Sequence, residues 1–340
     1  MPRPAVNVIT IDDFLNKHKS SWINGTDKTL KANEQIKFDG DLLYIGDSFV
    51  RRERISELFT MIDKRIKISA DDMPFDLVET ITRYLLGRSV KPEITILDNE
   101  IVSFMHKKIP YTLKDLCAEI QCITESYLIA IDSRVGDDFV RIYSIDKVRE
   151  AEPQQGDVVC SGLAVQVTIK GLIEIYPFSF RMWCSNGAIH KIDEREKNWS
   201  FQFNGGGEDS EGWFGHVKEK YAATASSMLK RISSLTTKTV RTNEISKFLR
   251  VILGQQHSLP RRELDSIINR DNSINAYDLW NLTTRAYTTL AKKNYKQAFK
   301  YFKLGGAIGD YLGGPHDGDV ECVACGHKIG EINGHYRPTI

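Results

Sequence analysis

The longest continuous β-type segment constrains the fold of this chain most strongly. Residues 158–189 contain two apolar arms that meet at Lys170-Gly171, a pair suited to a tight turn between antiparallel strands. In the second arm, alternate residues point to opposite faces of the strand, and both sets are substantially apolar. This is expected of a strand that is covered on both faces. This segment therefore predicts a long hairpin inside the core, with other elements packed on either side of it.

Two further hairpins are predicted before this segment. Residues 93–104 read as two short strands around Asp98-Asn99, and both residue types tolerate turn geometry. Residues 127–145 form the other hairpin, whose turn holds Gly136-Asp137-Asp138.

Apolar residues at helical spacing predict helices around the hairpins and throughout the last third of the chain. The helix that follows Thr112 has Asp115 three residues further on, close to the capping-box pattern. The longest helical stretch, residues 274–303, is expected to break near Lys293-Asn294. Further helices are predicted at residues 12–19, 54–67, 75–86, 213–234, 243–254 and 261–270.

Strands followed by helices are typical of the α+β class. We therefore predict an α+β fold in which an antiparallel β-sheet, built from hairpins within about 93–190, packs with helices and precedes a helical C-terminal third. The predicted domains are a polar N-terminal extension at 1–40, an α+β core at 41–303 (β-rich at 93–190, helical at 213–303) and a Gly-rich tail with a Cys/His cluster at 304–340.

The distribution of charge is more informative than its total. The chain has 46 Lys+Arg and 45 Asp+Glu residues, so its formal charge of +1 predicts no partner. In the last third, however, the stretches between Glu219 and Glu244 and between Asp278 and Asp310 contain cations and no acidic residue. These cations are candidate nucleic-acid-binding residues: Lys230, Arg231, Lys238, Arg241, Arg285, Lys292, Lys293, Lys296, Lys300 and Lys303.

Aromatic residues accompany the second of these stretches. Four of its lysines recur at intervals of four, four and three residues and share one helix face: Lys292, Lys296, Lys300 and Lys303. Three rings share an adjacent face: Tyr295, Phe299 and Phe302. Lysines that neutralise phosphates beside rings that stack on bases are what a single-stranded nucleic acid requires. The same pattern is also typical of an amphipathic helix whose rings belong to the core.

The C-terminal tail contains a candidate zinc site. Cys322 and Cys325 form a C-x-x-C pair, and His316 and His335 are spaced so that they could complete four ligands. The alternative is a reduced, exposed thiol pair without metal.

The sequence does not support several other classes of protein. Six cysteines are too few for a disulfide scaffold of this length, and no apolar run is long enough to span a membrane. The N-terminal residues lack the features of a signal peptide, so we expect a cytoplasmic protein. The P-loop, nucleophile-elbow and zinc-protease patterns are absent, and no catalytic residue is indicated.

Two segments resemble a known family. Arg181-Met182-Trp183-Cys184-Ser185-Asn186-Gly187-Ala188 is similar to the R-x-x-C-[ST]-N-G sequence of the phage/plasmid-like protein family, the domain of unknown function 932. Trp280, Asn281 and Thr284 resemble the aromatic-x-N-x-x-T helix of that family. The resemblance covers roughly residues 50–305 and implies a phage or plasmid origin and a cytoplasmic setting. It brings no established reaction, so no catalytic residue is carried over.

Within the first segment, Arg181 is the residue most suited to contact a ligand, because it is a charge on an otherwise apolar strand. The combined sequence features predict a phage- or plasmid-type nucleic-acid-binding protein, with single-stranded DNA as the favoured partner. Its role would be strand binding or annealing in recombination or replication, with self-association along the strand and no turnover. Annealing proteins related to Rad fifty-two offer only a fold-level analogy.

Two alternatives remain open at this point. In the first, the basic surface meets an acidic host protein, such as a defence or replication factor. In the second, carboxylates in loops hold a metal ion and the protein is a metal-dependent nuclease.

Overall fold

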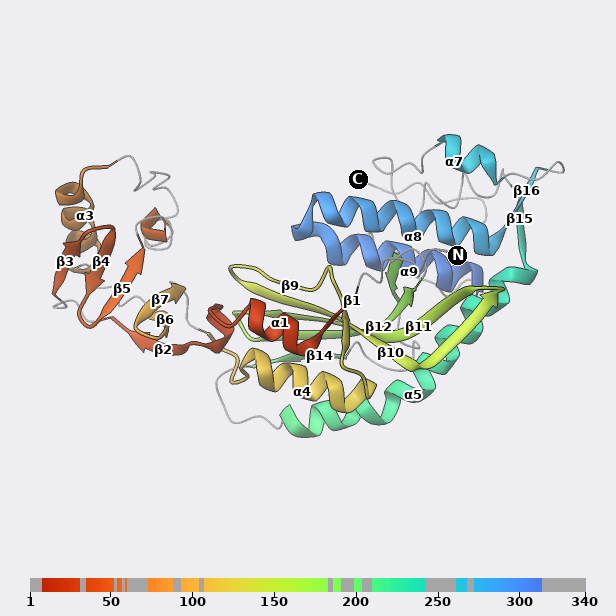
Figure 1. Ribbon diagram of the computed structural model, residues 1–340, viewed down its shortest axis with the longest axis horizontal. Coiled ribbons are helices and arrows are strands. Elements are labelled where there is room, and N and C mark those ends of the chain that lie inside the picture. Colours follow the sequence, from red (N-terminus) through yellow and green to blue (C-terminus); the bar gives the residue numbers. More distant parts are fainter. Residues whose placement is uncertain are drawn as a thin grey trace, which may run out of the picture.

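The structure is a computed structural model (Figure 1) that describes residues 8–30, 35–51, 54–56, 59, 73–87, 93–103, 107–182, 186–190, 199–203, 210–241, 261–267 and 272–313. They form a main lobe around an eight-stranded antiparallel sheet and a small lobe around a six-stranded sheet. The predicted α+β class with antiparallel sheets and C-terminal helices is confirmed. No helix in the described ranges is both long and apolar enough to cross a membrane.

The main sheet has the strand order β1-β8-β10-β11-β12-β13, with β9 paired to β10 and β14 paired to β12. Its strands are β1 (Val8–Thr10), β8 (Leu128–Ala130), β9 (Arg134–Val135), β10 (Phe139–Gln154), β11 (Asp157–Thr168), β12 (Leu172–Arg181), β13 (Asn186–Ile189) and β14 (Trp199–Gln202). The predicted central hairpin is confirmed as β11–β12, and Gly171 has the positive φ of 91° that its turn requires.

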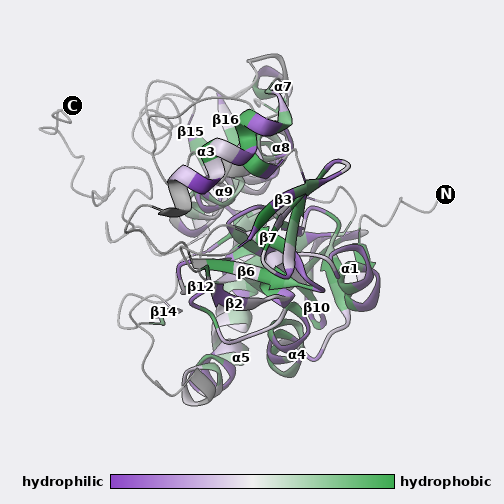
Figure 2. Cartoon of the chain, turned by 90° about the vertical axis from the view of Figure 1, so that its left-hand side faces the viewer, coloured by the Kyte–Doolittle hydropathy of each residue, from purple (hydrophilic) through white to green (hydrophobic). Residues whose placement is uncertain are grey.

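Helices cover both faces of the main sheet, above and below it in Figures 1 and 2. The main-lobe helices are α1 (Ile11–Lys17), α4 (Leu113–Thr124), α5 (Ser210–Ser234), α7 (Arg261–Ser266), α8 (Ala276–Lys293) and α9 (Ala298–Gly313). Leu163 and Val165 of β11 lie in the cluster with α1, α4 and the start of α5, whereas Ala164 lies with α8 and α9. Burial on both sides of the sheet explains why the side chains on both faces of these strands are apolar.

Short elements connect these layers. They are η1 (Trp22–Asn24), η3 (Leu235–Thr237), β15 (Thr239–Arg241), β16 (Ser273–Asn275) and η4 (Tyr295–Gln297).

Two local helix signals are confirmed. Thr112 Oγ1 accepts a hydrogen bond from the Asp115 amide at 3.2 Å, and Asp115 Oδ2 accepts one from the Thr112 amide at 2.9 Å. The helical stretch after residue 274 breaks at Asn294, whose φ of −133° and ψ of 84° are not helical. As a result α9 folds back along α8. The predicted helix at 243–254 and most of that at 54–67 lie outside the described residues.

The small lobe is inserted into the main lobe between η1 and α4. It contains β2 (Thr26–Thr29), β3 (Ile36–Asp39), β4 (Leu42–Ile45), β5 (Ser48–Arg51), α3 (Phe75–Gly87), β6 (Glu93–Leu97) and β7 (Glu100–Ser103). The sheet packs its inner face against α3 and has a core of its own, which includes Leu43, Val50, Val78 and Ile101.

This insertion changes the predicted domain boundaries in two places. Residues 1–40 were expected to be a polar extension, but β1 pairs with β8 and Phe14 of α1 is fully buried in the main core. The predicted hairpin at 93–104 forms as β6–β7, with Asp98 and Asn99 at positive φ, but it belongs to the second sheet. Local patterns predict strands, whereas the sheet that a strand joins depends on contacts distant in sequence.

The expected Gly-rich tail also begins later than residue 304, because its first glycines lie inside α9. A Cβ atom at Gly306 would collide with the carbonyl oxygen of Ile189, and one at Gly309 would contact the Trp280 indole at 2.5 Å. These glycines let α9 approach β13 and α8 closely, so here they extend a helix instead of ending it.

Gly306→Ala is expected to lower the free energy of unfolding by about 2 kcal/mol or more, because α9 must move away from β13. Urea unfolding followed by circular dichroism measures this. Gly215→Ala in α5, where a Cβ meets nothing within 4 Å, is the control and should stabilise the protein by about 0.5–1 kcal/mol. Equal stability of the two variants would contradict the packing of α9 described above.

Candidate nucleic-acid interface

Arg181, the residue predicted from the family-like segment, is engaged within the fold. Its Nε lies 2.6 and 2.7 Å from the two carboxylate oxygens of Asp157, and the Tyr277 hydroxyl donates to the same carboxylate at 2.8 Å. The Arg181 side chain is only 18% exposed. This cluster ties β12 to β11 and α8.

The two segments that carry the family resemblance are brought together by this packing. Arg181 lies 5.9 Å from the ring of Tyr277, and the Gly187 amide donates to Thr288 Oγ1 at 3.4 Å. Both contacts join the β12–β13 region to α8, although about ninety residues lie between the end of β13 and the start of α8. Cys184 lies outside the described residues.

Two of the predicted lysines also have partners inside the protein. Lys238 donates to the carbonyl oxygens of Leu312 and Gly313, both at 3.1 Å, and so caps the C-terminal end of α9. Lys303 lies 3.9 Å from the centroid of Tyr176, and burial lowers its pKa. Neither lysine is a freely exposed phosphate contact.

The remaining candidate cations lie at different ends of α8. The Ala276 amide donates to the Lys238 carbonyl at 2.9 Å, which places the η3–β15 region at the start of α8. The exposed Lys292 and Lys293 are at its other end, roughly 24 Å away at 1.5 Å per residue. The structure therefore does not bring all the predicted cations onto one surface. Lys230, Arg231 and Arg241 belong with the first end, Lys296 and Lys300 with the second, and Arg285 lies between them.

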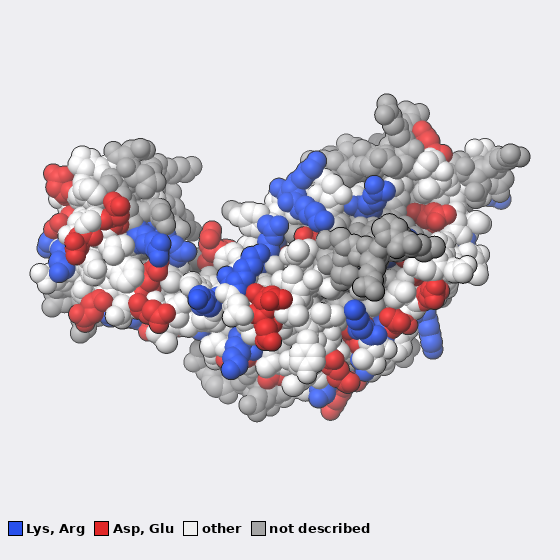
Figure 3. Space-filling view, viewed as in Figure 1, with Lys and Arg blue, Asp and Glu red and all other residues white. Residues whose placement is uncertain are grey.

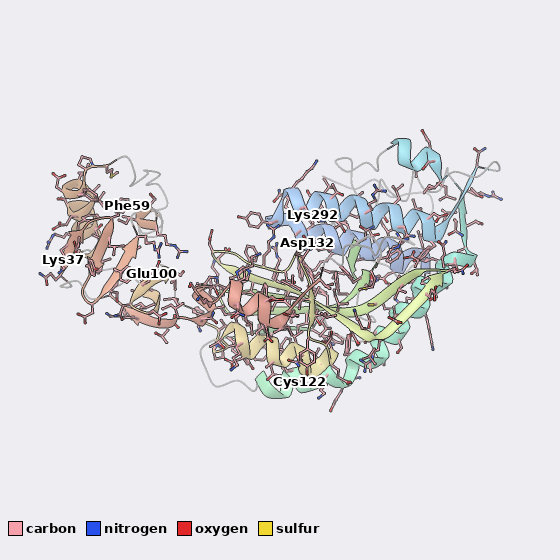
Figure 4. The ribbon with its side chains drawn as sticks, in the orientation of Figure 1. Lys37, Phe59, Glu100, Cys122, Asp132 and Lys292 are labelled. Atoms are coloured by element: carbon pink, nitrogen blue, oxygen red, sulfur yellow. The ribbon has the colours of Figure 1, made fainter. Side chains whose placement is uncertain are left out.

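A pocket opens at the second end, where the break between α8 and α9 lies over the β9–β10 hairpin. We call it the α8–β10 pocket, and its lining residues are Asp132, Arg134, Phe139, Arg141, Tyr143, Ala291, Lys292, Tyr295, Ala298 and Phe302. Figure 4 shows Asp132 directly below Lys292 at this end of α8, and Figure 3 shows cationic side chains around it. The pocket combines rings, cations and one carboxylate.

Buried Arg141 organises this pocket. Its guanidinium lies 4.4 Å from the centroid of Phe139, its Nε donates to Gln166 Oε1 at 2.8 Å, and its terminal nitrogen donates to the Tyr295 carbonyl. The Tyr295 ring stacks on Phe139 with centroids 6.0 Å apart and an interplanar angle of 29°, and it is 40% exposed. Arg141 thus holds an exposed aromatic ring at the mouth of the pocket.

Tyr143 contributes a buried polar group to the same pocket. The residue is 1% exposed, and its hydroxyl has no hydrogen-bond partner among the described residues. Burial raises the pKa of Tyr143, so the phenol stays neutral and keeps its proton. A buried polar group without a partner is costly, so this hydroxyl lowers the stability of the fold around the pocket.

The electrostatics around the pocket are basic but mixed. The exposed cations are Arg134, Lys292, Lys293 and Lys300, while Asp132 is half-buried in the lining and Asp137 and Asp138 are exposed in the β9–β10 turn. Exposed cations therefore surround the mouth of the pocket, while its lining also contains the carboxylate of Asp132.

A Ser–His–Asp chain elsewhere in the main lobe was not predicted. Ser179 Oγ lies 2.7 Å from His190 Nε2, and His190 Nδ1 lies 2.8 Å from Asp310 Oδ1. All three residues are at most 3% exposed. Since no substrate reaches the serine in this conformation, the chain serves to fasten α9 to β12 and β13. Its members come from three distant segments, so no local pattern could reveal it.

The predicted zinc ligands Cys322, Cys325, His316 and His335 lie outside the described residues. Within the ranges that the structure describes, no group of three or more His, Cys, Asp or Glu side chains could hold a metal ion.

Comparisons with protein-family models, with curated proteins and with solved structures give no match for this chain. The similarity to the phage/plasmid-like family therefore remains a prediction that rests on the two quoted segments.

Sequence reasoning identified Lys292 and Tyr295 but missed the strand side of the pocket. Phe139, Arg141 and Tyr143 alternate along β10 and therefore share a face. This alternation was available in the predicted hairpin at 127–145. What the sequence could not supply was the position of the α8–α9 break above that face.

Tyr143→Phe is expected to leave the free energy of unfolding unchanged or to raise it by up to about 1 kcal/mol, because no hydrogen bond of the described structure is lost. Ser179→Ala, a matched loss of one buried hydroxyl, should cost about 1–2 kcal/mol because His190 loses its partner. Chemical denaturation measures both. A loss of more than about 1 kcal/mol in Tyr143→Phe would assign the hydroxyl a structural role.

Proposed function

We propose that this protein binds single-stranded nucleic acid, with DNA as the favoured form, through the α8–β10 pocket and the cations around it. The observation that carries the proposal is the exposed Tyr295 ring, fixed on Phe139 and flanked by exposed Lys292 and Lys293. Stacking on such a ring is open to unpaired bases, because paired bases in a duplex are already stacked.

The proposed mechanism is passive. Lys292, Lys293 and Arg134 hold the sugar–phosphate backbone and release its counterions, while Tyr295 stacks on a base. No bond is made or broken in this process. Self-association along the strand would add cooperativity. In the phage or plasmid setting implied by the family resemblance, such binding serves recombination or replication in the host cytoplasm.

An acidic or apolar protein partner is the second candidate function. Three large apolar side chains that flank β8 or belong to β10 are strongly exposed: Tyr127 at 67%, Ile131 at 47% and Val148 at 70%. Exposed apolar groups of this kind favour a protein contact. Affinity capture from a nuclease-treated host lysate separates the candidates, since a protein partner survives the nuclease and a nucleic-acid bridge does not.

The double variant Lys292→Ala/Lys293→Ala is expected to bind an oligodeoxynucleotide about tenfold or more weakly at about 50 mM salt. The slope of log affinity against log salt should fall by about 1.4, because each phosphate contact on a single strand contributes about 0.7. Fluorescence anisotropy of the labelled oligonucleotide, titrated over salt, measures both quantities.

Lys230→Ala is the matched control for this experiment. Lys230 is exposed on α5, and its neighbour Arg231 lies against Gly313 at the far end of α9 from Lys300. We expect less than a twofold change in affinity. An equal loss in the control, or wild-type binding that does not depend on salt, would remove the proposal.

A further inference from the structure

A row of polar side chains crosses three strands of the main sheet. Arg141 of β10, Gln166 of β11 and Glu174 of β12 are direct cross-strand neighbours in the register of these strands. The row lies on the face that α8 and α9 cover, because Ala164, two residues from Gln166 on β11, belongs to the core of that face. Polar groups under a layer of helices must find their partners within the fold.

Gln166 connects the two charged members of this row. Its Oε1 accepts a hydrogen bond from Arg141 Nε at 2.8 Å, and its Nε2 donates one to Glu174 Oε2 at 3.2 Å. Only this orientation of the amide serves both neighbours, because a guanidinium offers donors alone and a carboxylate offers acceptors alone. The glutamine therefore joins a cation to an anion without carrying a charge of its own.

The row is attached to the α8–α9 return at two points. At one end, Arg141 donates to the Tyr295 carbonyl of η4. At the other end, Lys303 of α9 donates to the Tyr176 hydroxyl at 2.5 Å, and this hydroxyl donates to Glu174 Oε1 at 2.7 Å. Lys303 Nζ also lies 3.8 Å from Glu174 Oε1. The sheet thus holds both the helix break and the helix that follows it.

The directionality of these bonds bears on the exposed ring. Burial of apolar surface holds α9 on the sheet but is not directional, so it does not by itself fix one position of the break. Hydrogen bonds are directional, and a connected polar network specifies one arrangement of the elements that it joins. Here that arrangement includes the Tyr295 ring, which stacks on Phe139 and is 40% exposed.

We propose that Gln166 is a positioning residue for Tyr295, because it holds Arg141 in the place from which the guanidinium bonds the Tyr295 carbonyl. This inference rests on the single-strand binding proposed above. A ring that is already fixed loses little freedom when a base stacks on it, so the affinity depends on this preorganisation. Without Gln166, Arg141 loses a partner, and the ring samples orientations in which it does not stack.

Gln166→Met tests this role, because a thioether of similar length fills the same space but cannot bridge the two charged neighbours. Its affinity for an oligodeoxythymidine of about 12 nucleotides is expected to fall about fivefold, which is part of the worth of one stacked base. Fluorescence anisotropy measures this. The slope of log affinity against log salt should not change, because no phosphate contact is lost. In the Tyr295→Ala background the same substitution should weaken binding by less than about twofold.

The exchange variant Gln166→Glu/Glu174→Gln is the rescue. Its carboxylate on β11 accepts from Arg141 and from the new amide on β12, and that amide accepts from the Tyr176 hydroxyl. Every bond of the row keeps a donor and an acceptor at unchanged net charge, so the affinity should return to within about twofold of the wild-type value.

Asn24→Ala is the control for a loss of stability alone. Asn24 Nδ2 donates to the Lys19 carbonyl at 3.1 Å, and its Oδ1 accepts from the Leu113 amide at 3.0 Å. It therefore also bridges separate elements, but on the face of the sheet that α1 and α4 cover. We expect a lower urea midpoint and a change in affinity of less than about twofold.

Hydrogen exchange of η4, followed by mass spectrometry, is a second readout that needs no ligand. The Ala298 amide donates to the Tyr295 carbonyl, and the Gln297 amide donates to the Asn294 carbonyl at 3.0 Å. These amides should exchange about tenfold faster in Gln166→Met and at the wild-type rate in Asn24→Ala. If Gln166→Met does not fold, Gln166→Asn, whose amide is too short to bridge both neighbours, should show the same changes.

The outcomes separate the two proposals. Wild-type affinity in Gln166→Met, a lower salt slope, an equal loss in the Tyr295→Ala background, or a loss that the exchange variant does not repair overturns the positioning role and leaves single-strand binding standing. Unchanged hydrogen exchange of η4 also overturns it. Failure of the wild-type protein to bind the oligonucleotide overturns the proposed function itself, and hydrogen exchange then still decides whether Gln166 fixes η4.

Discussion

Burial of the β10–β11–β12 strands on both faces is the constraint on which the main lobe depends. Leu163 and Val165 pack toward α1, α4 and α5, while Ala164 and Tyr176 pack toward α8 and α9. On each face, burial of apolar surface stabilises the fold by roughly 25 cal/mol per Å². Separating either layer of helices from the sheet would therefore cost a large free energy. The position of α8 and α9 over β10 is fixed in this way, and the pocket lies where those helices break above the strand.

The pocket depends on a second, more local interaction. Arg141 is a buried cation that bonds the Tyr295 carbonyl, stacks on Phe139 and is held by Gln166. A buried guanidinium is tolerated because its donors and its flat face are both occupied. By joining β10 to η4 it turns a helix break, which on its own would be a mobile connection, into a fixed platform for Tyr295. The proposed stacking on Tyr295 depends on this link.

Features encoded within a few residues were predicted well. The capping box at Thr112, the turn at Gly171 and the break at Asn294 were all identified, because each depends on the backbone preferences of adjacent residues. The candidate site was predicted only in part. Lys292 and Tyr295 were identified from helical spacing, whereas the strand residues beneath them were not, and Lys238 and Arg181 proved to hold the fold together. The sequence alone does not show whether the partner of a charged side chain is a ligand or a carboxylate from a distant part of the chain.

The sequence by itself determined the α+β class, the central hairpin with its two apolar faces, and the acid-free stretches of the C-terminal third. Only the tertiary structure decided that residues 26–103 form a separate lobe, that the cations divide between the two ends of α8, and that Asp132 and Tyr143 meet at one pocket. The physical reason is the distance along the chain over which each kind of interaction acts. Periodicity and capping act over one or two turns of chain, while strand partners, helix placement and the pairing of buried charges depend on contacts a hundred or more residues apart.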